Sequence, residues 1–186
     1  MSKARAKKIK LLLLDVDGVM TDGKIFLYPV SSEAQIEVKG FHAHDGTGFS
    51  LARLGGVKTG LITKRISETV RLRARDLKIE HVYQGVSDKL TAFREILKKE
   101  NLKPEEAAFV GDDIIDLPVM RNCGLAFAVA NAREDVKDEA HVITDHRGGE
   151  GAVRDAVEYI LKAQGSLAKC VEAYVADRAP VEDKHQ

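Results

Sequence analysis

Two pairs of carboxylates end apolar runs in this 186-residue sequence. Asp15 and Asp17 follow the run LLLL, and residues i and i+2 of an extended chain point to the same side, so the two side chains project together. Asp112 and Asp113 end a later run in the same way. Carboxylates this close repel unless a cation lies between them or one holds a proton. A turn that merely contains acidic residues is the alternative, but it does not explain two charges after an all-apolar run.

Oxygen-only ligands of this kind favour Mg²⁺ over zinc. His42 and His44 have no cysteine or third histidine nearby, so we interpret them as loop residues or substrate contacts. Thr63 ends another apolar run and offers a hydroxyl, while Lys89 falls in the first turn of an expected helix, where its ammonium and the helix N-terminus both favour an anion. Gly18 lets the backbone approach a ligand. The ordered set predicts a site for a divalent cation and a phosphate group.

The elements that must position these groups follow from the alternation of short apolar runs with helical patterns, which predicts a parallel sheet covered by helices on both faces. The carboxyl ends of its strands would form the ligand-binding edge. A β-hairpin over 24–28 and 35–39 interrupts the alternation, and the intervals between the polar groups leave no room for a cap domain. We expect strands at 9–14, 57–62, 81–84, 107–110, 124–129 and 141–144, and helices at 87–99, about 150–163 and 166–176, with another beginning near 116–118.

Composition excludes several classes of protein. Lysine and arginine total 29 and aspartate and glutamate total 29, and this balance gives no reason to expect nucleic acid as a partner. No apolar stretch approaches the ~20 residues of a membrane helix, and the basic N-terminus lacks the features of a secretory signal. Cys123 and Cys170 fit packed, reduced thiols and a cytoplasmic protein.

We expect a solvated basic arm over 1–8, one domain over 9–164, a helix over 165–176 and a flexible tail over 177–186.

The ordered motifs are also recognisable. The sequence resembles the haloacid dehalogenase superfamily of phosphohydrolases, whose motifs match DVDGV, Thr63, Lys89 and GDD. DVDGVMTDG, the hairpin, HDGTG, ITKR, YQGVSDKL, VGDDIIDLPVM and RGGEGAVR resemble the family of 3-deoxy-D-manno-octulosonate 8-phosphate phosphatases, across roughly residues 9–164. The resemblance implies a three-layer, Rossmann-like α/β fold without a cap domain. It also implies Mg²⁺-dependent hydrolysis of that sugar acid phosphate in lipopolysaccharide inner-core synthesis, by a homotetramer in which a neighbouring subunit covers the site.

The same resemblance implies a role for each motif residue. Asp15 would be the nucleophile that forms an aspartyl-phosphate, and Asp17 the acid for the leaving alcohol and then the base for water. Asp15, the backbone carbonyl of Asp17, and Asp112 would hold Mg²⁺, while Asp113 and Asp116 would orient the loop. The phosphoryl group and the sugar acid would contact Asp17, Gly18, His42, Ala43, His44, Asp45, Gly46, Thr63, Arg65, Arg73 and Lys89.

Arg73 gives an independent indication of the substrate. Helical geometry at ~100° per residue places it about 20° from Ile66 on the apolar stripe of its helix. An arginine there needs an anionic partner. That partner is either a carboxylate of the protein, in a structural salt bridge, or the carboxylate of the substrate, which Arg73 would bind together with Arg65. Alternatively, the aliphatic part of the side chain packs flat on the surface and the guanidinium stays in water. Lys64 and the segment His42–His44 depart from the family pattern T-G-R and N-V-R. A nine-carbon keto-deoxy sugar acid phosphate is therefore a rival substrate, and a non-catalytic oligomerisation or binding domain is a third hypothesis.

Overall fold

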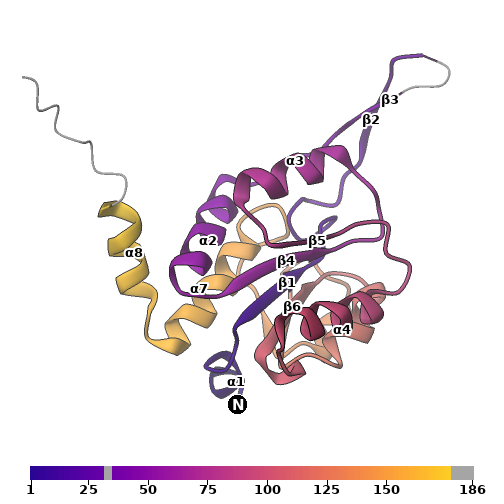
Figure 1. Cartoon of the computed structure of the whole chain (residues 1–186). Coiled ribbons are helices and arrows are strands. Elements are labelled where there is room, and N and C mark those ends of the chain that lie inside the picture. The colour runs from indigo at the N-terminus through magenta and orange to yellow at the C-terminus, as the bar shows by residue number, and fades with distance from the viewer. Residues whose placement is uncertain (32–34, 177–186) are drawn as a thin grey trace, which may run out of the picture.

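Six parallel strands form the central sheet of the computed structural model, which describes residues 1–31 and 35–176 (Figure 1). Their order across the sheet is β5-β4-β1-β6-β7-β8. All four leucines of β1 are fully buried, because this central strand pairs with β4 on one side and β6 on the other. The strands are β1 (Leu11–Leu14), β4 (Lys58–Ile62), β5 (His81–Tyr83), β6 (Ala107–Gly111), β7 (Leu125–Ala128) and β8 (Val142–Ile143). The predicted parallel sheet is confirmed.

Helices cover both faces of this sheet, with α2, α3 and α7 on one side and α4 on the other (Figure 1). The helices are α1 (Ser2–Ala6), α2 (Ala43–Leu54), α3 (Glu68–Leu77), α4 (Lys89–Glu100), α5 (Leu117–Met120), α6 (Glu134–Glu139), α7 (Ala152–Gln164) and α8 (Leu167–Ala176). Short 3₁₀ turns span Pro104–Glu106 and Ile114–Asp116. The apolar stripe expected over 150–163 is the buried face of α7, which packs against α2. In the described part of the chain, no helix is long and apolar enough to cross a membrane.

The hairpin is formed by β2 (Phe26–Pro29) and β3 (Gln35–Val38), which pair antiparallel and project from the body of the molecule (Figure 1). Residues 32–34 of its expected turn lie outside the described residues, as does the expected tail over 177–186. Within residues 1–31 and 35–176 there is no cap domain over the sheet, as the sequence intervals predict. The hairpin is the element that the sequence analysis identified as an interruption of the alternation.

The N-terminal segment differs from the solvated arm that its charge suggests. Residues Ser2–Ala6 form α1, which packs against α7 and buries Ala6 completely. Arg5 Nη1 donates a hydrogen bond to the Gly124 carbonyl (2.8 Å), and Tyr159 Oη donates to Ser2 Oγ (2.7 Å). The small alanine side chain permits this close packing while the lysines stay in water. At the other end of the domain, α8 packs on α2 and α7 of this same chain.

Candidate active site

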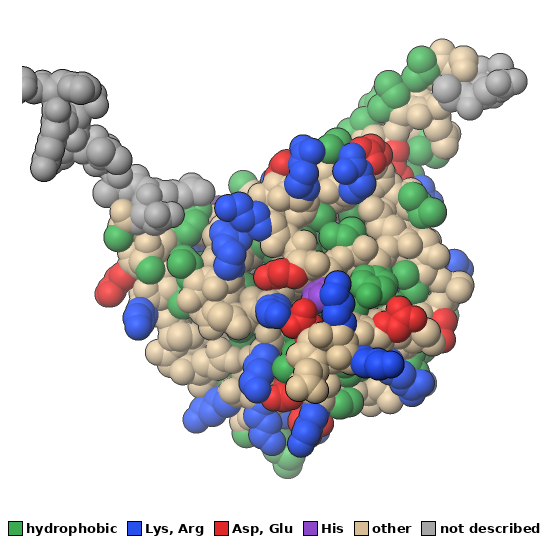
Figure 2. All heavy atoms as spheres, in the orientation of Figure 1, with side chains coloured by type: hydrophobic (Ala, Val, Ile, Leu, Met, Phe, Trp, Pro, Cys, Tyr) green, Lys and Arg blue, Asp and Glu red, His purple; other side chains and the backbone are tan. Residues whose placement is uncertain are grey.

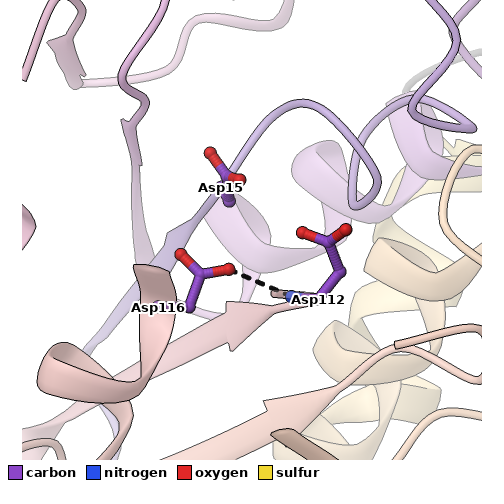
Figure 3. A group of neighbouring side chains, drawn as sticks. All are labelled: Asp15, Asp112 and Asp116. Carbon is purple, nitrogen blue, oxygen red and sulfur yellow. Dashed lines mark hydrogen bonds between the residues drawn. The ribbon is translucent and has the colours of Figure 1, made fainter. Parts of the chain in front are cut away.

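Three carboxylates meet at the carboxyl edge of the sheet. Because β1 and β6 are neighbours, with Leu14 opposite Val110, the residues that follow them lie side by side. Ligand atoms of Asp15, Asp112 and Asp116 all lie within 4.8 Å of one another, and the side chains point into a shared space (Figure 3). The sequence analysis paired Asp15 with Asp112 at this edge, and the structure brings Asp116 to them as well.

Asp116 is held by hydrogen bonds on both of its oxygens. Its side chain is fully buried; Oδ1 accepts from Lys89 Nζ (2.7 Å), and Oδ2 accepts from the backbone N–H of Asp112 (3.0 Å, Figure 3). The 3₁₀ turn Ile114–Asp116 folds the chain back under β6 so that this contact can form. Asp116 therefore fixes the backbone that carries Asp112, which agrees with the orienting role that the resemblance implies for it.

Lys89 supplies the positive charge of the cluster. Its ammonium lies 2.8 Å from Asp15 Oδ1 as well as 2.7 Å from Asp116 Oδ1, and the side chain is 3% exposed. The lysine is the first residue of α4, because the Asp88 carboxylate caps the helix by accepting from the backbone N–H groups of residues 90 and 91. Asp88 is thus the N-cap of α4. The placement of Lys89 in the first turn is as the sequence predicts.

The charges of this cluster do not balance. Burial, together with the Asp116 carboxylate, raises the pKa of Asp15 to about 6, although Lys89 opposes the shift. Burial and the neighbouring carboxylates of Asp116, Asp15 and Asp113 raise the pKa of Asp112 to about 8. Burial alone would lower the pKa of Lys89, but the Asp15 and Asp116 carboxylates raise it. The cluster therefore carries more negative charge than one lysine neutralises, which favours the binding of a further cation.

Magnesium fits the donors that the cluster offers. Asp112 Oδ1 is buried and has no hydrogen-bond partner, and a buried, unpaired carboxylate oxygen is costly unless a cation binds it. All three neighbouring side chains offer oxygen alone, the ligand that Mg²⁺ prefers. Since both oxygens of Asp116 are already hydrogen bonded, Asp15 and Asp112 are the side chains free to coordinate.

The side chain of Asp17 lies close to two cations. Lys39 Nζ donates a hydrogen bond to Asp17 Oδ1, and Arg65 Nε lies 3.7 Å from Oδ2. Asp17 is therefore not one of the three clustered carboxylates. This arrangement is compatible with the expectation that Asp17 would contact a metal through its backbone carbonyl and use its carboxyl group for proton transfer.

A cavity of about 250 Å³ lies over these groups. Residues that follow β1, β4 and β6 line it. One of them is Thr63, which is 3% exposed. Its lining residues are Asp15, Asp17, Thr63, Lys64, Arg65, Asp112, Asp113 and Ile115. Lys89 and Asp116 do not line the cavity. The phosphate and metal residues predicted from the sequence thus converge on one place.

Gly18 has the backbone conformation that its place beside the site demands. Its φ is +93°, a left-handed value that favours glycine, and a Cβ there would overlap the Asp112 carboxylate. The same loop is supported from the far end of the domain, because Gly149 N–H donates to the Val19 carbonyl (3.0 Å) and a Cβ on Gly148 would overlap the Gly18 carbonyl. Gly18 therefore permits the close approach of the Asp112 side chain, while its approach to a ligand stays a prediction.

The segment 42–46, for which the resemblance implies contact with the substrate, does not line this cavity. His42 is the N-cap residue of α2, and its ring packs edge-on against His44 with centroids 4.8 Å apart. Ala43 begins the helix and is exposed. Asp45 is buried and accepts a hydrogen bond from the Arg154 backbone N–H (2.9 Å), which ties α2 to α7. Asp45 therefore has a packing contact in place of the expected exposure to substrate.

Arg73 has no ion-pair partner among residues 1–31 and 35–176, so the structural salt bridge considered above is not formed there. Its guanidinium lies 5.7 Å from the centroid of the Phe41 ring, and its Nε is buried without a hydrogen-bond partner. Gly46 makes room for it, because a Cβ at that position would lie 3.0 Å from an Arg73 Nη. The stripe argument was wrong for Ile66, which precedes α3 and is 82% exposed. The unpaired Nε leaves a hydrogen-bond donor for an anion.

Two residues near the site, Glu37 in β3 and Lys39 directly after it, were not predicted from the sequence. Lys39 reaches Asp17, and Glu37 accepts hydrogen bonds from Ser67 Oγ and Arg65 Nη2 (the latter 3.1 Å). Both alternate with apolar residues at the end of an exposed strand, where charged side chains are ordinary. Their spacing of two residues, which places both on one face of the strand, was the available signal.

Comparisons with known proteins agree with this geometry. A model of haloacid dehalogenase-like hydrolases matches residues 62–157. The 3-deoxy-D-manno-octulosonate 8-phosphate phosphatase of Escherichia coli is 43% identical over 164 residues, which cover 88% of this chain and 85% of the relative. The crystal structure of the phosphatase of that name from Yersinia pestis has 41% identity and a TM-score of 0.85 over 90% of this chain and 88% of its own. The phosphatase of the same name from Moraxella catarrhalis, solved with magnesium, phosphate and KDO, has 38% identity and a TM-score of 0.86 over 92% of this chain and 97% of its own.

The fold and the site define a phosphoric monoester hydrolase of the haloacid dehalogenase type, without a cap domain in the described residues. Within that class, the chain belongs to the family of 3-deoxy-D-manno-octulosonate 8-phosphate phosphatases.

Proposed function

We propose that this chain hydrolyses 3-deoxy-D-manno-octulosonate 8-phosphate to the free sugar acid and phosphate, with Mg²⁺ as its cofactor. The observation that carries the proposal is the convergence of Asp15, Asp112, Asp116 and Lys89 at one edge of the sheet, in a chain 43% identical to an enzyme named for that activity. Magnesium, held by Asp15, Asp112 and the Asp17 carbonyl, would neutralise charge on the phosphoryl group.

The reaction divides into two displacements. In the first, a carboxylate oxygen of Asp15 attacks phosphorus, the ester P–O bond breaks, and the leaving alkoxide takes a proton from the Asp17 carboxyl group. In the second, water attacks the aspartyl-phosphate, Asp17 takes the proton from that water, and the bond to Asp15 breaks. Thr63, which lines the cavity, and Lys89, whose ammonium lies 2.8 Å from Asp15 Oδ1, would bind phosphoryl oxygens, and Lys89 would reduce the repulsion between the Asp15 carboxylate and an anionic ester.

Phosphate release in the presence of Mg²⁺ tests this function. The wild-type chain should release phosphate from 3-deoxy-D-manno-octulosonate 8-phosphate, whereas Asp15→Asn should fold normally and show no steady-state turnover. Mass spectrometry of quenched wild-type enzyme should find the phosphoryl group on Asp15. Substantial turnover by Asp15→Asn would remove the proposed nucleophile, and an inactive wild type would remove the enzymatic proposal in favour of a binding domain.

Arg73 and Arg65 support a substrate that carries a carboxylate. Arg73 Nε is buried without a partner, and the Arg65 side chain is 44% exposed beside Asp17. A panel of sugar phosphates tests this recognition: keto-deoxy sugar acids should be preferred to neutral sugar phosphates, and equal rates would contradict it. Lys64 lines the cavity, and Lys64 and the segment His42–His44 depart from the family pattern, so the panel also includes a nine-carbon keto-deoxy sugar acid 9-phosphate as the rival substrate.

We also propose that a neighbouring subunit covers the site, in a homotetramer. The hairpin exposes a dense set of apolar side chains, visible in green along the projecting arm in Figure 2, and a patch of this kind is typical of an interface. These side chains are Phe26, Leu27, Tyr28, Val30, Ile36 and Val38, each 45–64% exposed. Light scattering of the wild type and of Phe26→Asp tests the proposal: an active monomeric wild type would contradict it.

A cytoplasmic location and a step in lipopolysaccharide inner-core synthesis complete the proposal. The two cysteines support a reducing compartment, because both are free and buried. Deletion of the encoding gene in a bacterium that contains it, followed by measurement of the 8-phosphate in the cytoplasmic extract, tests both statements. Accumulation of the phosphate is expected, and an unchanged level would contradict the assignment to that step.

A further inference from the structure

Lys39 joins the base of the hairpin to the carboxyl group of Asp17. It directly follows β3, and its side chain is 0% exposed. Its ammonium donates a hydrogen bond to Asp17 Oδ1 and lies 3.8 Å from Glu37 Oε2. A lysine is almost never buried in this way unless a carboxylate pairs with it. The carboxylate that Lys39 contacts most closely is Asp17, the proposed proton donor and acceptor.

The backbone that carries Lys39 is fixed from the other side of the cavity. Glu37, two residues earlier, accepts hydrogen bonds from Ser67 Oγ and from Arg65 Nη2. Thr69 Oγ1 donates to the Glu37 carbonyl (3.3 Å). These hydrogen bonds hold the pKa of Glu37 below its usual value, although burial opposes the shift. The end of β3 is therefore attached to the segment that follows β4, and the ammonium of Lys39 is presented from a rigid support.

The contacts of Asp17 distinguish its two oxygens. Oδ1 accepts the hydrogen bond of Lys39, whereas Arg65 Nε lies 3.7 Å from Oδ2, beyond hydrogen-bond distance. An oxygen that already accepts a hydrogen bond from a buried ammonium is poorly suited to hold the acidic proton of the carboxyl group. Oδ2 is thus the oxygen left to give a proton to a leaving group and to take one from water.

We propose that Lys39 is a positioning residue that holds Oδ1 of Asp17 and so directs Oδ2 to the reacting atoms. The proposal rests on the proposed phosphatase chemistry. Proton transfer by a placed side chain contributes roughly 10²- to 10⁴-fold to rate, and a misplacement of about 1 Å costs on the order of 10²-fold. A lysine that merely balanced charge would affect stability without affecting the proton-transfer step selectively.

The leaving group separates these two roles. An alkyl phosphate needs a proton on its departing oxygen, whereas p-nitrophenolate leaves without one, and kcat/KM reports the steps up to that departure. In Lys39→Met, kcat/KM for the alkyl ester should fall about 10²-fold, and for p-nitrophenyl phosphate by less than about 5-fold. Lys39→Arg should recover part of the alkyl-ester rate. Lys24→Met is the matched control, because Lys24 lies at the start of the same hairpin, 70% exposed and paired with Asp22.

A double-mutant cycle decides whether the effect passes through Asp17. In the Asp17→Asn background, Lys39→Met should change the residual alkyl-ester kcat/KM by less than about 3-fold, because the two residues act as one unit. Equal losses on both esters, or a full 10²-fold loss in the Asp17→Asn background, would overturn the proposal. If Lys39→Met does not fold, Lys39→Gln is measured in the same cycle with the same expected outcomes.

The choice of alkyl ester keeps this test separate from the substrate assignment. The ester is 3-deoxy-D-manno-octulosonate 8-phosphate or, if the wild type does not hydrolyse it, an alkyl phosphate that the sugar phosphate panel identifies. Failure of the first ester contradicts the assigned substrate alone. An unselective loss in Lys39→Met with an active wild type contradicts the role of Lys39 alone.

Discussion

Removal of the Lys89 charge should destabilise the metal-free protein strongly. Lys89 lies within 2.8 Å of both Asp15 and Asp116, and the exposed fractions of the three side chains are 3%, 6% and 0%. In Lys89→Met these carboxylates, with Asp112 beside them, would have no side-chain cation in contact. Breaking a buried ion pair by removal of one partner costs about 3–5 kcal/mol, because the remaining charge stays out of water.

A second route limits this cost. One carboxyl group could take up a proton in the variant. Protonation of an aspartate with the ordinary pKa of 3.8 costs about 1.4 kcal/mol for each pH unit above that pKa, which is about 4 kcal/mol at pH 7. Because protonation limits the cost to about 4 kcal/mol, the expected loss in the free energy of unfolding is about 3–4 kcal/mol. For a chain of this length, the loss corresponds to a fall in Tm of roughly 6–16 °C.

Urea unfolding in the presence of EDTA, at pH 7, measures this loss, with circular dichroism as the signal. Lys137→Met is the matched control, since Lys137 pairs at 3.0 Å with Glu134, whose side chain is 83% exposed, and such a pair contributes no more than about 1 kcal/mol. Addition of Mg²⁺ should reduce the difference between wild type and Lys89→Met, because a divalent cation replaces part of the missing charge. A loss below about 1 kcal/mol in EDTA would refute the view that Lys89 neutralises this cluster.

Three further predictions follow from the geometry. Gly18→Ala should lower kcat by at least about 10²-fold with little change in fold, because the added methyl group displaces Asp112; circular dichroism and phosphate release check this, and a near-wild-type rate would contradict it. Arg73→Met should raise KM for a keto-deoxy sugar acid phosphate by about 10-fold or more and leave p-nitrophenyl phosphate hydrolysis nearly unchanged, as steady-state kinetics would show. Histidine NMR titration should give a midpoint below 6.5 for His141, whose pKa burial and Arg5 lower, and above 6.5 for His146, whose pKa is raised by the hydrogen bond that its ring donates to the Asp155 carboxylate. His141 therefore lowers the free energy of unfolding as the pH falls below 6.5. The small contribution of His146 to the free energy of unfolding is complete below pH 6.5 and is lost as the pH rises through its midpoint. The reverse order of midpoints would contradict both assignments.

The sequence was sufficient for the sheet and for the convergence of Asp15, Asp112 and Lys89 because both depend on local rules. An apolar run such as LLLL can only be buried, and a carboxylate that follows it must lie at the carboxyl edge of a parallel sheet. Neighbouring strands then bring Asp15 and Asp112 together whatever the loops do. Lys89 was predictable for the same reason, since the first residue of a helix that follows a strand lies at that edge.

Contacts that depend on the direction of one side chain were not predictable. Asp17 contacts Lys39 only because the end of β3 lies beside the loop after β1, and nothing local in the sequence fixes the angle of the hairpin. Asp45 is similar, because its hydrogen bond comes from Arg154, which is distant in the chain. The basic N-terminus misled for another reason: its charges suggested a solvated arm, and one buried alanine was enough to pack it as a helix.

The hydrogen bond between Gly149 and Val19 has a consequence for the order in which the protein matures. The loop that carries the proposed nucleophile is made early in translation, but one of its supports, the segment around Gly148, is made only after β8. A nascent chain that ends before this segment lacks the contacts that close the loop from that side, even if β1, β4 and β6 have already paired. Catalytic competence should therefore arise late on the ribosome, after most of the sheet has left the exit tunnel.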